Sequence, residues 1–260
     1  DDVRAFFRRF YHPANASLAI AGDVDAGRAL ELAAAYFGDI PGGEPPALVP
    51  RAPARAVPAR RLIEDRVELP RLYLGWLSPA MYAPGDAELD LLGDVLATGK
   101  ASRLYRSLVY DRRIATDVAA YQGSRELGSS FQIVATAVPG VGLGVLEEAI
   151  HAEVARVRAD DISADELART VALTETAFVS RLQTVGGFGG KSDQLNNYNV
   201  FLGDPGWFSR DLERYRRASA GSIRAAAAAH LDPSCCVAIS AVPAGQPGLA
   251  APGSEQVVIT

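Results

Sequence analysis

Two aspartates spaced one helical turn apart are the first residues of this sequence whose types and spacing could support chemistry. Asp90 and Asp94 lie in a stretch with helical apolar periodicity, so a helix would place both carboxylates on one face. Carboxylate oxygens at that spacing could bind a hard cation weakly. An acidic helix face exposed to solvent is the simpler interpretation, so the pair by itself predicts no metal site.

The histidines, His12, His151 and His230, do not form a zinc-binding pattern. A catalytic zinc site uses about three protein ligands. His12 and His230 lie beside predicted helix ends, where an imidazole can contact terminal carbonyl groups. His151 has no second histidine one turn away, and no serine–histidine or cysteine–histidine pattern is visible. We therefore predict structural roles for these histidines, and neither a metal ligand nor a catalytic residue in this chain.

The glycine-rich run at residues 186–190, GGFGG, is followed by Lys191 and Ser192 and could suggest a phosphate-binding loop. Such a loop needs a preceding strand and a longer glycine spacing than this run provides. A predicted helix precedes the run instead. We interpret it as a break between two helices.

Composition and charge narrow the class of protein. The 260 residues carry a net charge of -5, which argues against a nucleic-acid or anionic-membrane partner. No apolar run reaches the roughly 18 residues of a membrane helix. The cysteines, Cys235 and Cys236, are adjacent, and neighbouring side chains of a strand point to opposite faces, so no disulfide is expected. Neither the cysteines nor a targeting segment decides the compartment.

The residues from Leu89 to Tyr110 predict two helices joined at a glycine turn. Leu89, Leu92, Val95 and Leu96 recur at steps of three and four, as on one buried helical face. Gly99 suits the residue just past a helix end because it can adopt positive φ. Ser102 is the predicted N-cap of the second helix.

The remaining pattern indicates an α+β fold, with a mainly antiparallel sheet and helices packed on one face. Residues 69–78 predict a strand buried on both faces. Ser163 and Glu166 form a capping-box pair. Predicted helices cover residues 2–11, 25–37, 143–158, 163–185, 193–201, 207–215 and 219–230; predicted strands cover residues 17–24, 61–67, 69–78, 114–121, 129–138 and 235–242, with a possible short strand at 256–260.

An internal repeat suggests how the chain is organised. FYHPANASLAIAGDV and AHLDPSCCVAISAV each combine a helix end, a proline turn and a short apolar run, with Pro13 matching Pro233. Two such units about one domain length apart favour tandem related domains. We expect residues 1–42 to be the end of a preceding domain, 43–60 a linker, 61–245 a complete domain and 246–260 a tail. Arg51, Arg55, Arg60 and Arg61 are expected to be solvated within or beside the linker.

The segments YHPANASLAIAGDVD, AYFGDIP, LGDVLATGKASRLYRSL and ISAVP resemble the pitrilysin/insulinase family of zinc peptidases, which includes the subunits of the mitochondrial processing peptidase. In the catalytic domain of that family, the corresponding helix carries the zinc motif H-x-x-E-H. Aligned on Gly99, the motif positions fall on Asp90, Gly93 and Asp94, which supply neither the histidines nor the glutamate. The resemblance therefore points to the inactive, C-terminal portion.

The resemblance implies the fold of the mitochondrial-processing-peptidase/LuxS-like metalloenzyme domains. It also implies that this chain by itself is not an enzyme. The chain would instead form part of a peptide-binding chamber and dock on a catalytic peptidase domain, in cis or in a partner subunit. Zinc is expected in that catalytic domain, the parent would hydrolyse peptide bonds, and a homo- or heterodimer is possible. Thr98, Gly99, Lys100, Tyr121 and Arg125 are the candidate residues facing an extended peptide substrate.

Other functions remain open. Some members of the family are non-catalytic structural or assembly subunits, and the parent of this chain could be one. An unrelated α+β binding module is a weaker alternative, which a different sheet order would reveal.

Overall fold

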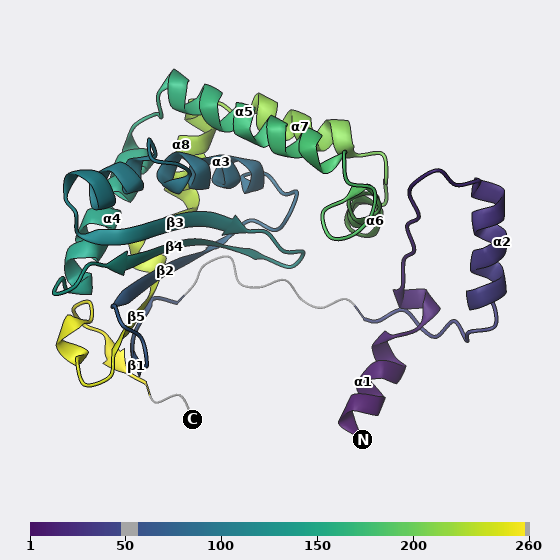
Figure 1. Cartoon of the computed structure of the whole chain (residues 1–260), viewed down its shortest axis with the longest axis horizontal. Helices are drawn as coiled ribbons and strands as arrows, with labels where there is room; N and C mark the ends of the chain where they lie inside the picture. The colour runs from purple at the N-terminus through teal and green to yellow at the C-terminus, as the bar shows by residue number, and fades with distance from the viewer. Residues whose placement is uncertain (48–56, 258–260) are drawn as a thin grey trace. The chain divides into compact units, whose positions relative to one another are not determined.

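The computed structural model describes residues 1–47 and 57–257 (Figure 1). The chain forms two compact units. The first comprises Asp1–Pro50 and Glu175–Glu213, and the second comprises Arg51–Thr174 and Arg214–Thr260.

The second unit is built on a six-stranded sheet with the order β3-β4-β2-β5-β1-β6. Neighbours from β3 through β5 run antiparallel, whereas β1 pairs in parallel with both β5 and β6. The strands are β1 (Ala59–Asp65), β2 (Arg71–Ser78), β3 (Ala115–Gly123), β4 (Ser129–Ala137), β5 (Val237–Pro243) and β6 (Glu255–Gln256). The predicted hairpin is thus confirmed. The possible short strand at 256–260 is found as Glu255–Gln256, and residues 258–260 lie outside the described residues.

Helices cover one face of this sheet (Figure 1). The helices α3 (Asp86–Ala97), α4 (Leu143–Ala159) and α8 (Ala220–His230) pack on it. On β2, Leu72, Leu74 and Trp76 are buried beneath them, while Tyr73 on the opposite face is 36% exposed. The prediction that this strand is buried on both faces was therefore wrong, but the predicted α+β fold with helices on one face is confirmed.

The helix–glycine–helix stretch forms as predicted, with two differences in detail. Leu89, Leu92, Val95 and Leu96 are fully buried, and Gly99 follows the end of α3 with a φ of +79°. The next segment, η2 (Tyr105–Asp111), is wound as a π-helix. Ser102 does not cap it, because its hydroxyl donates a hydrogen bond back to the Gly99 carbonyl.

The first unit contains α1 (Asp2–Phe10), η1 (Pro13–Asn15), α2 (Ala26–Phe37) and α6 (Lys191–Leu202), while α5 (Ala164–Arg181) and α7 (Phe208–Arg217) each continue from one unit into the other. Asp25 caps α2, accepting from the Arg28 amide at 2.7 Å. Residues 17–24 are not a strand, contrary to prediction. No strand lies beside them in the described residues, and an extended segment needs a neighbour to complete its backbone hydrogen bonds.

A helix capping box and the short turns around β5 are further local features of the structure. The Ser163–Glu166 capping box is present, with backbone-to-side-chain hydrogen bonds of 2.8 and 3.2 Å. The turns η3 (Pro233–Cys235) and η4 (Pro247–Leu249) flank β5. Arg51 and Arg55 lie outside the described residues.

Arg60 and Arg61 were predicted to be solvated within or beside the linker. Both instead belong to β1 and form ion pairs, although the Arg61 side chain stays 42% exposed. Arg60 pairs with Glu147 at 2.6 Å, and Arg61 pairs with Glu255 at 2.6 Å. The first strand therefore begins at Ala59, within the predicted linker.

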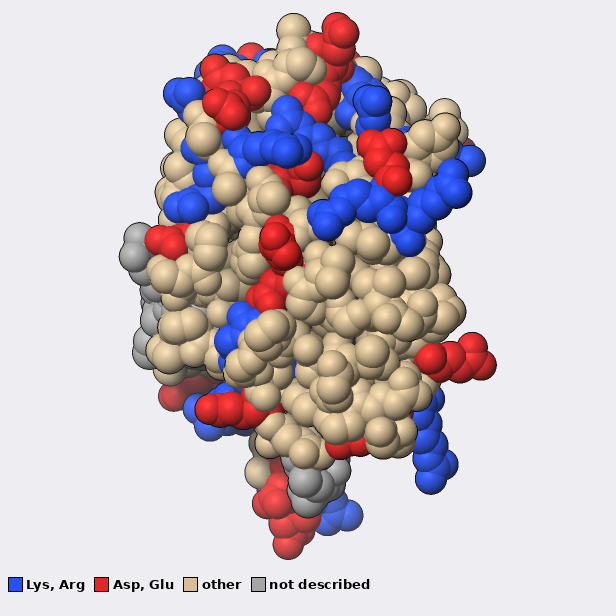
Figure 2. Space-filling view, turned by 90° about the vertical axis from the view of Figure 1, so that its left-hand side faces the viewer, with Lys and Arg blue, Asp and Glu red and all other residues tan. Residues whose placement is uncertain are grey.

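The surface near α4 carries charges of both signs. Figure 2 shows this side, with acidic and basic side chains interspersed over its upper part and a broad uncharged area below.

Over residues 1–47 and 57–257, no helix combines the length and apolarity needed to span a membrane.

Candidate functional site

The helix α3 occupies the position at which the sequence resemblance placed a zinc-binding helix. It lies close to β3 at Gly93, where an added Cβ would lie 3.1 Å from the Ala120 carbonyl oxygen and 3.3 Å from the Tyr121 Cα. Both distances are shorter than nearly all real Cβ contacts. A side chain at position 93 would therefore require β3 to move away by a few tenths of an ångström.

Asp90, one turn earlier on α3, is engaged by another side chain. The Tyr215 hydroxyl donates a 2.7 Å hydrogen bond to Asp90 Oδ2. Burial raises the pKa of Asp90 to about 7, and this hydrogen bond only partly offsets that effect. The prediction that Asp90 and Asp94 form an acidic helix face exposed to solvent is thus wrong for Asp90, because Asp90 lies partly buried against Tyr215.

Asp94 forms a local contact instead of a shared cation site. It accepts a 2.7 Å hydrogen bond from the Thr98 hydroxyl at the end of the same helix. Partial burial raises the pKa of Asp94. Within the described ranges, no group of three or more His, Cys, Asp or Glu side chains could hold a metal ion. The residues present on α3 therefore do not fit catalytic zinc.

Asp86, at the start of α3, organises the buried polar contacts around this helix. It is 1% exposed and accepts from the Arg214 guanidinium at 3.2 Å and from the Ser124 hydroxyl at 2.6 Å. The Tyr82 amide donates to it at 2.9 Å. Arg214 also lies over the rings of Tyr82 and Tyr215, at 5.3 and 5.5 Å from their centroids. Sequence reasoning missed this cluster, because an acidic residue in a first helical turn needs no distant partner.

The substrate-facing residues predicted from the sequence separate into two groups at the ends of α3, with Tyr121 apart from both. Thr98, Gly99 and Lys100 form the exposed turn at the C-terminal end of α3. Arg125 lies near the other end, since its carbonyl accepts from the Met81 amide just before α3. A helix of 12 residues is about 18 Å long, so the two groups do not form one cluster.

Tyr121 lies on the sheet face opposite the helices. It is 45% exposed, and its hydroxyl donates to Gln132 at 2.9 Å. That face also contains a groove of about 330 Å³ centred on Gly75, between Tyr73, Gln132 and Val237. An added Cβ at Gly75 would meet nothing within 4 Å.

The histidines take part in structural contacts. The ring of His12 lies 3.0 Å from the Arg9 carbonyl at the end of α1 and 2.9 Å from the Gly42 carbonyl. His151 contacts Glu147 at 3.6 Å, and the edge of its ring meets Trp76. Burial lowers the pKa of His230. The contacts of His12 and His151 agree with their predicted structural roles.

The ion pair between Arg60 and Glu147 ties β1 to α4. Burial acts to raise the pKa of Glu147, but hydrogen bonds from His151 and Arg60 outweigh it and lower that pKa to about 2. The Cys236 thiol lies close by, and burial raises its pKa to about 12. A thiol with such a pKa is not a nucleophile at neutral pH.

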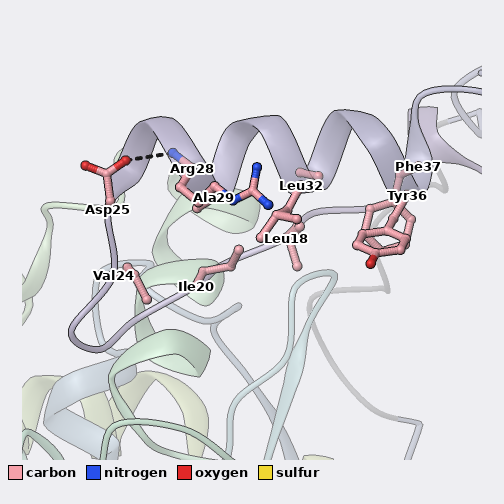
Figure 3. A pocket seen from close by; sticks show the side chains of 10 residues that line it. Leu18, Ile20, Val24, Asp25, Arg28, Ala29, Leu32, Tyr36 and Phe37 are labelled. Carbon is pink, nitrogen blue, oxygen red and sulfur yellow. Dashed lines mark hydrogen bonds between the residues drawn. The ribbon is translucent and has the colours of Figure 1, made fainter.

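The N-terminal segment carries an apolar groove of about 390 Å³ (Figure 3). Leu18 and Ile20 lie under α2, with Val24 near its start and Tyr36 and Phe37 at its far end (Figure 3). Leu18 is 60% exposed and Tyr36 is 75% exposed. An apolar surface of this kind is typical of a segment that packs against further protein.

The sheet order, the helices on one face and the degenerate α3 helix together define a peptidase-like α+β domain without a zinc site in the described residues. The family model described as the peptidase M16 inactive domain matches residues 1–173. The chain therefore belongs to this family of inactive domains found in zinc proteases.

The chain is similar to several proteins of known sequence or structure. The chain is 26% identical to zinc protease PqqE of Helicobacter pylori over 189 residues, which cover 70% of this chain and 42% of that protein. A protease structure from Helicobacter pylori matches with a TM-score of 0.82 and 21% identity, over 93% of this chain and 59% of that one. A peptidase M16 inactive domain from Pseudomonas fluorescens matches with a TM-score of 0.74 and 18% identity, over 90% and 54% of the two chains. The chain thus spans less than half of the curated relative's length.

Proposed function

We propose that this chain is the non-catalytic portion of a zinc metallopeptidase, in which it forms part of the peptide-binding chamber and docks on a catalytic domain. The observation that carries this proposal is the state of α3. The helix keeps its place against β3, but its motif positions hold no histidine and no glutamate, Gly93 lies close to the β3 backbone, and Asp90 is engaged by Tyr215. Zinc and the water-activating glutamate would then belong to the catalytic domain of the parent.

The same proposal accounts for the N-terminal segment. Residues 1–42 would be the end of the preceding, catalytic-type domain, 43–60 the linker, 61–245 the non-catalytic domain and 246–260 its tail. The repeat supports this division, because α1 and η1 precede residues 17–24 as α8 and η3 precede β5. The exposed apolar side chains of Leu18 and Ile20 would then be covered by the sheet of the preceding domain.

Peptide binding, zinc content and hydrolysis, with and without a catalytic domain, test this function. The purified chain should bind unstructured peptides in a fluorescence anisotropy titration, retain no stoichiometric zinc by elemental analysis, and hydrolyse no peptide. Addition of the parent's catalytic domain should produce chelator-sensitive hydrolysis. Tight zinc at one equivalent, with chelator-sensitive cleavage by this chain alone, would contradict the proposal. A parent whose own H-x-x-E-H helix is degenerate would instead favour a structural or assembly subunit.

A further inference from the structure

The extended segment of the first unit, residues 17–21, leaves its backbone groups unpaired. It runs beneath α2 (Figure 3). It ends at Gly22, where φ is +141°. Over residues 1–47 and 57–257, none of the amide or carbonyl groups of this segment takes part in a hydrogen bond. Each backbone amide and carbonyl of a folded protein needs a partner, so this segment has an unmet need for hydrogen bonds along its length.

The two faces of this segment already lie against helices. Leu18 and Ile20 point toward α2 and line its apolar groove (Figure 3). The neighbouring Ser17 accepts a 3.3 Å hydrogen bond from the side chain of Asn199 on α6. Successive side chains of an extended chain point to opposite faces, so α2 and α6 lie on opposite sides of the segment. The open directions are therefore its two edges, and a β-strand is the element that completes the hydrogen bonds of such an edge.

The second unit contains the counterpart of this segment. In the internal repeat, residues 18–20 match residues 237–239 of β5, and each follows a short turn that begins at a proline. β5 lies between two strands, in parallel with β1 and antiparallel with β2. Residues 237–241 are paired on both edges. The matched segment thus has the preceding elements of a central strand, but neither neighbouring strand in the described residues.

We infer that residues 17–21 are the central strand of a sheet that two strands of the preceding domain complete, one parallel and one antiparallel, which rests on the proposed division of the chain. This chain then docks on the catalytic-type domain by strand insertion. Main-chain hydrogen bonds on both edges hold the strand, and its alternate side chains give the register. Neither part completes this sheet alone, so the stability of each depends on the other.

Residue-resolved hydrogen exchange in the whole parent protein and in this chain alone tests the inference. A central strand uses its amides on both edges, whereas an edge strand uses alternate amides only. The amides of residues 18–21 should all exchange about 100-fold more slowly in the parent than in this chain. Slow exchange at alternate amides only would make the segment an edge strand and overturn the central position. Equal exchange in the two proteins would overturn the insertion itself.

Ala19→Pro is an independent test, because proline has no amide hydrogen. In the parent, this change should lower the melting temperature by about 6–12 °C. In this chain alone it should change the melting temperature by less than about 2 °C, since the Ala19 amide has no partner there. Ala19→Ser keeps the amide and is the matched control, with no shift expected in either protein. A loss of equal size in both proteins, or no loss in the parent, would contradict the inference.

The strand insertion and the peptide-binding function fail separately, because hydrogen exchange and melting are measured without a peptide. If the amides of residues 18–21 are protected in the parent but no peptide binds, the insertion stands and the peptide-binding function is disproved. If peptide binds and chelator-sensitive hydrolysis is measured while these amides exchange equally fast in both proteins, the function stands and the insertion is overturned.

Discussion

The hydroxyl of Tyr215 donates a 2.7 Å hydrogen bond to the carboxylate of Asp90, across 125 residues of sequence. This contact lies where the family resemblance places the first zinc ligand. The carboxylate at that position therefore attaches the last residues of α7 to α3. The same segment supplies Arg214 to the buried Asp86.

The Asp90 carboxyl should make stability fall as the pH rises. Its folded-state pKa of about 7 is raised above its ordinary value of 3.8, so its contribution is complete below about pH 4 and is lost as the pH rises through 7. The loss should be about 2–4 kcal/mol, given 1.36 kcal/mol per pKa unit. Urea unfolding from pH 4 to 8 measures it. Asp90→Asn should flatten this part of the profile, whereas Glu88→Gln on the same helix should not.

The ion pair between Arg60 and Glu147 should produce the opposite pH dependence at acid pH. The pKa of Glu147 is lowered to about 2, so the stability from its ionised form is present above about pH 4.5 and is lost as the pH falls toward 2. Glu147→Gln should cost about 1–3 kcal/mol at pH 7, a range reduced for solvent screening because the Arg60 side chain is 36% exposed. The neighbouring, exposed Glu148→Gln is the control. Equal stabilities for both variants would contradict the assigned role.

Gly93→Ala tests the close approach of α3 to β3. Helix propensity alone predicts that alanine stabilises the helix by about 1 kcal/mol. The 3.1 Å contact with the Ala120 carbonyl should reverse the sign and destabilise the chain by about 1–3 kcal/mol. Gly221→Ala in α8, where an added Cβ would meet only the Ser219 hydroxyl at 3.9 Å, should not show that loss. A stabilised Gly93→Ala variant in thermal melts would show that the strand can move away.

Gly99→Val tests the turn after α3. The φ of +79° is costly for a β-branched residue, although an added Cβ would meet nothing within 4 Å. The backbone strain should cost about 1–2 kcal/mol and lower the melting temperature. Gly99→Asn should cost less, because asparagine tolerates this conformation. An unchanged melting temperature for the valine variant would count against a positive φ at this position in solution.

Features encoded over a few residues were predictable from the sequence. The apolar face of α3, the glycine at its end and the Ser163–Glu166 capping box depend on contacts within about one or two helical turns, which periodicity and residue type report directly. The sequence also showed that Asp90, Gly93 and Asp94 do not match the H-x-x-E-H zinc motif, because that comparison requires only the identity of three residues. Whether residues 17–24 pair as a strand could not be decided in this way, because that depends on which strand lies alongside.

The sequence by itself therefore determined most of the helices and strands, the α+β class and the absence of the zinc motif on one helix. Only the tertiary structure decided that Arg60 is a strand residue paired with Glu147, that Asp90 meets Tyr215, and that Thr98 and Arg125 lie at opposite ends of α3. The physical reason is that hydrogen bonds and ion pairs between distant segments depend on sheet order and helix packing, which no local pattern encodes. The partners of a buried charge such as Asp86 become visible only when the topology brings them together.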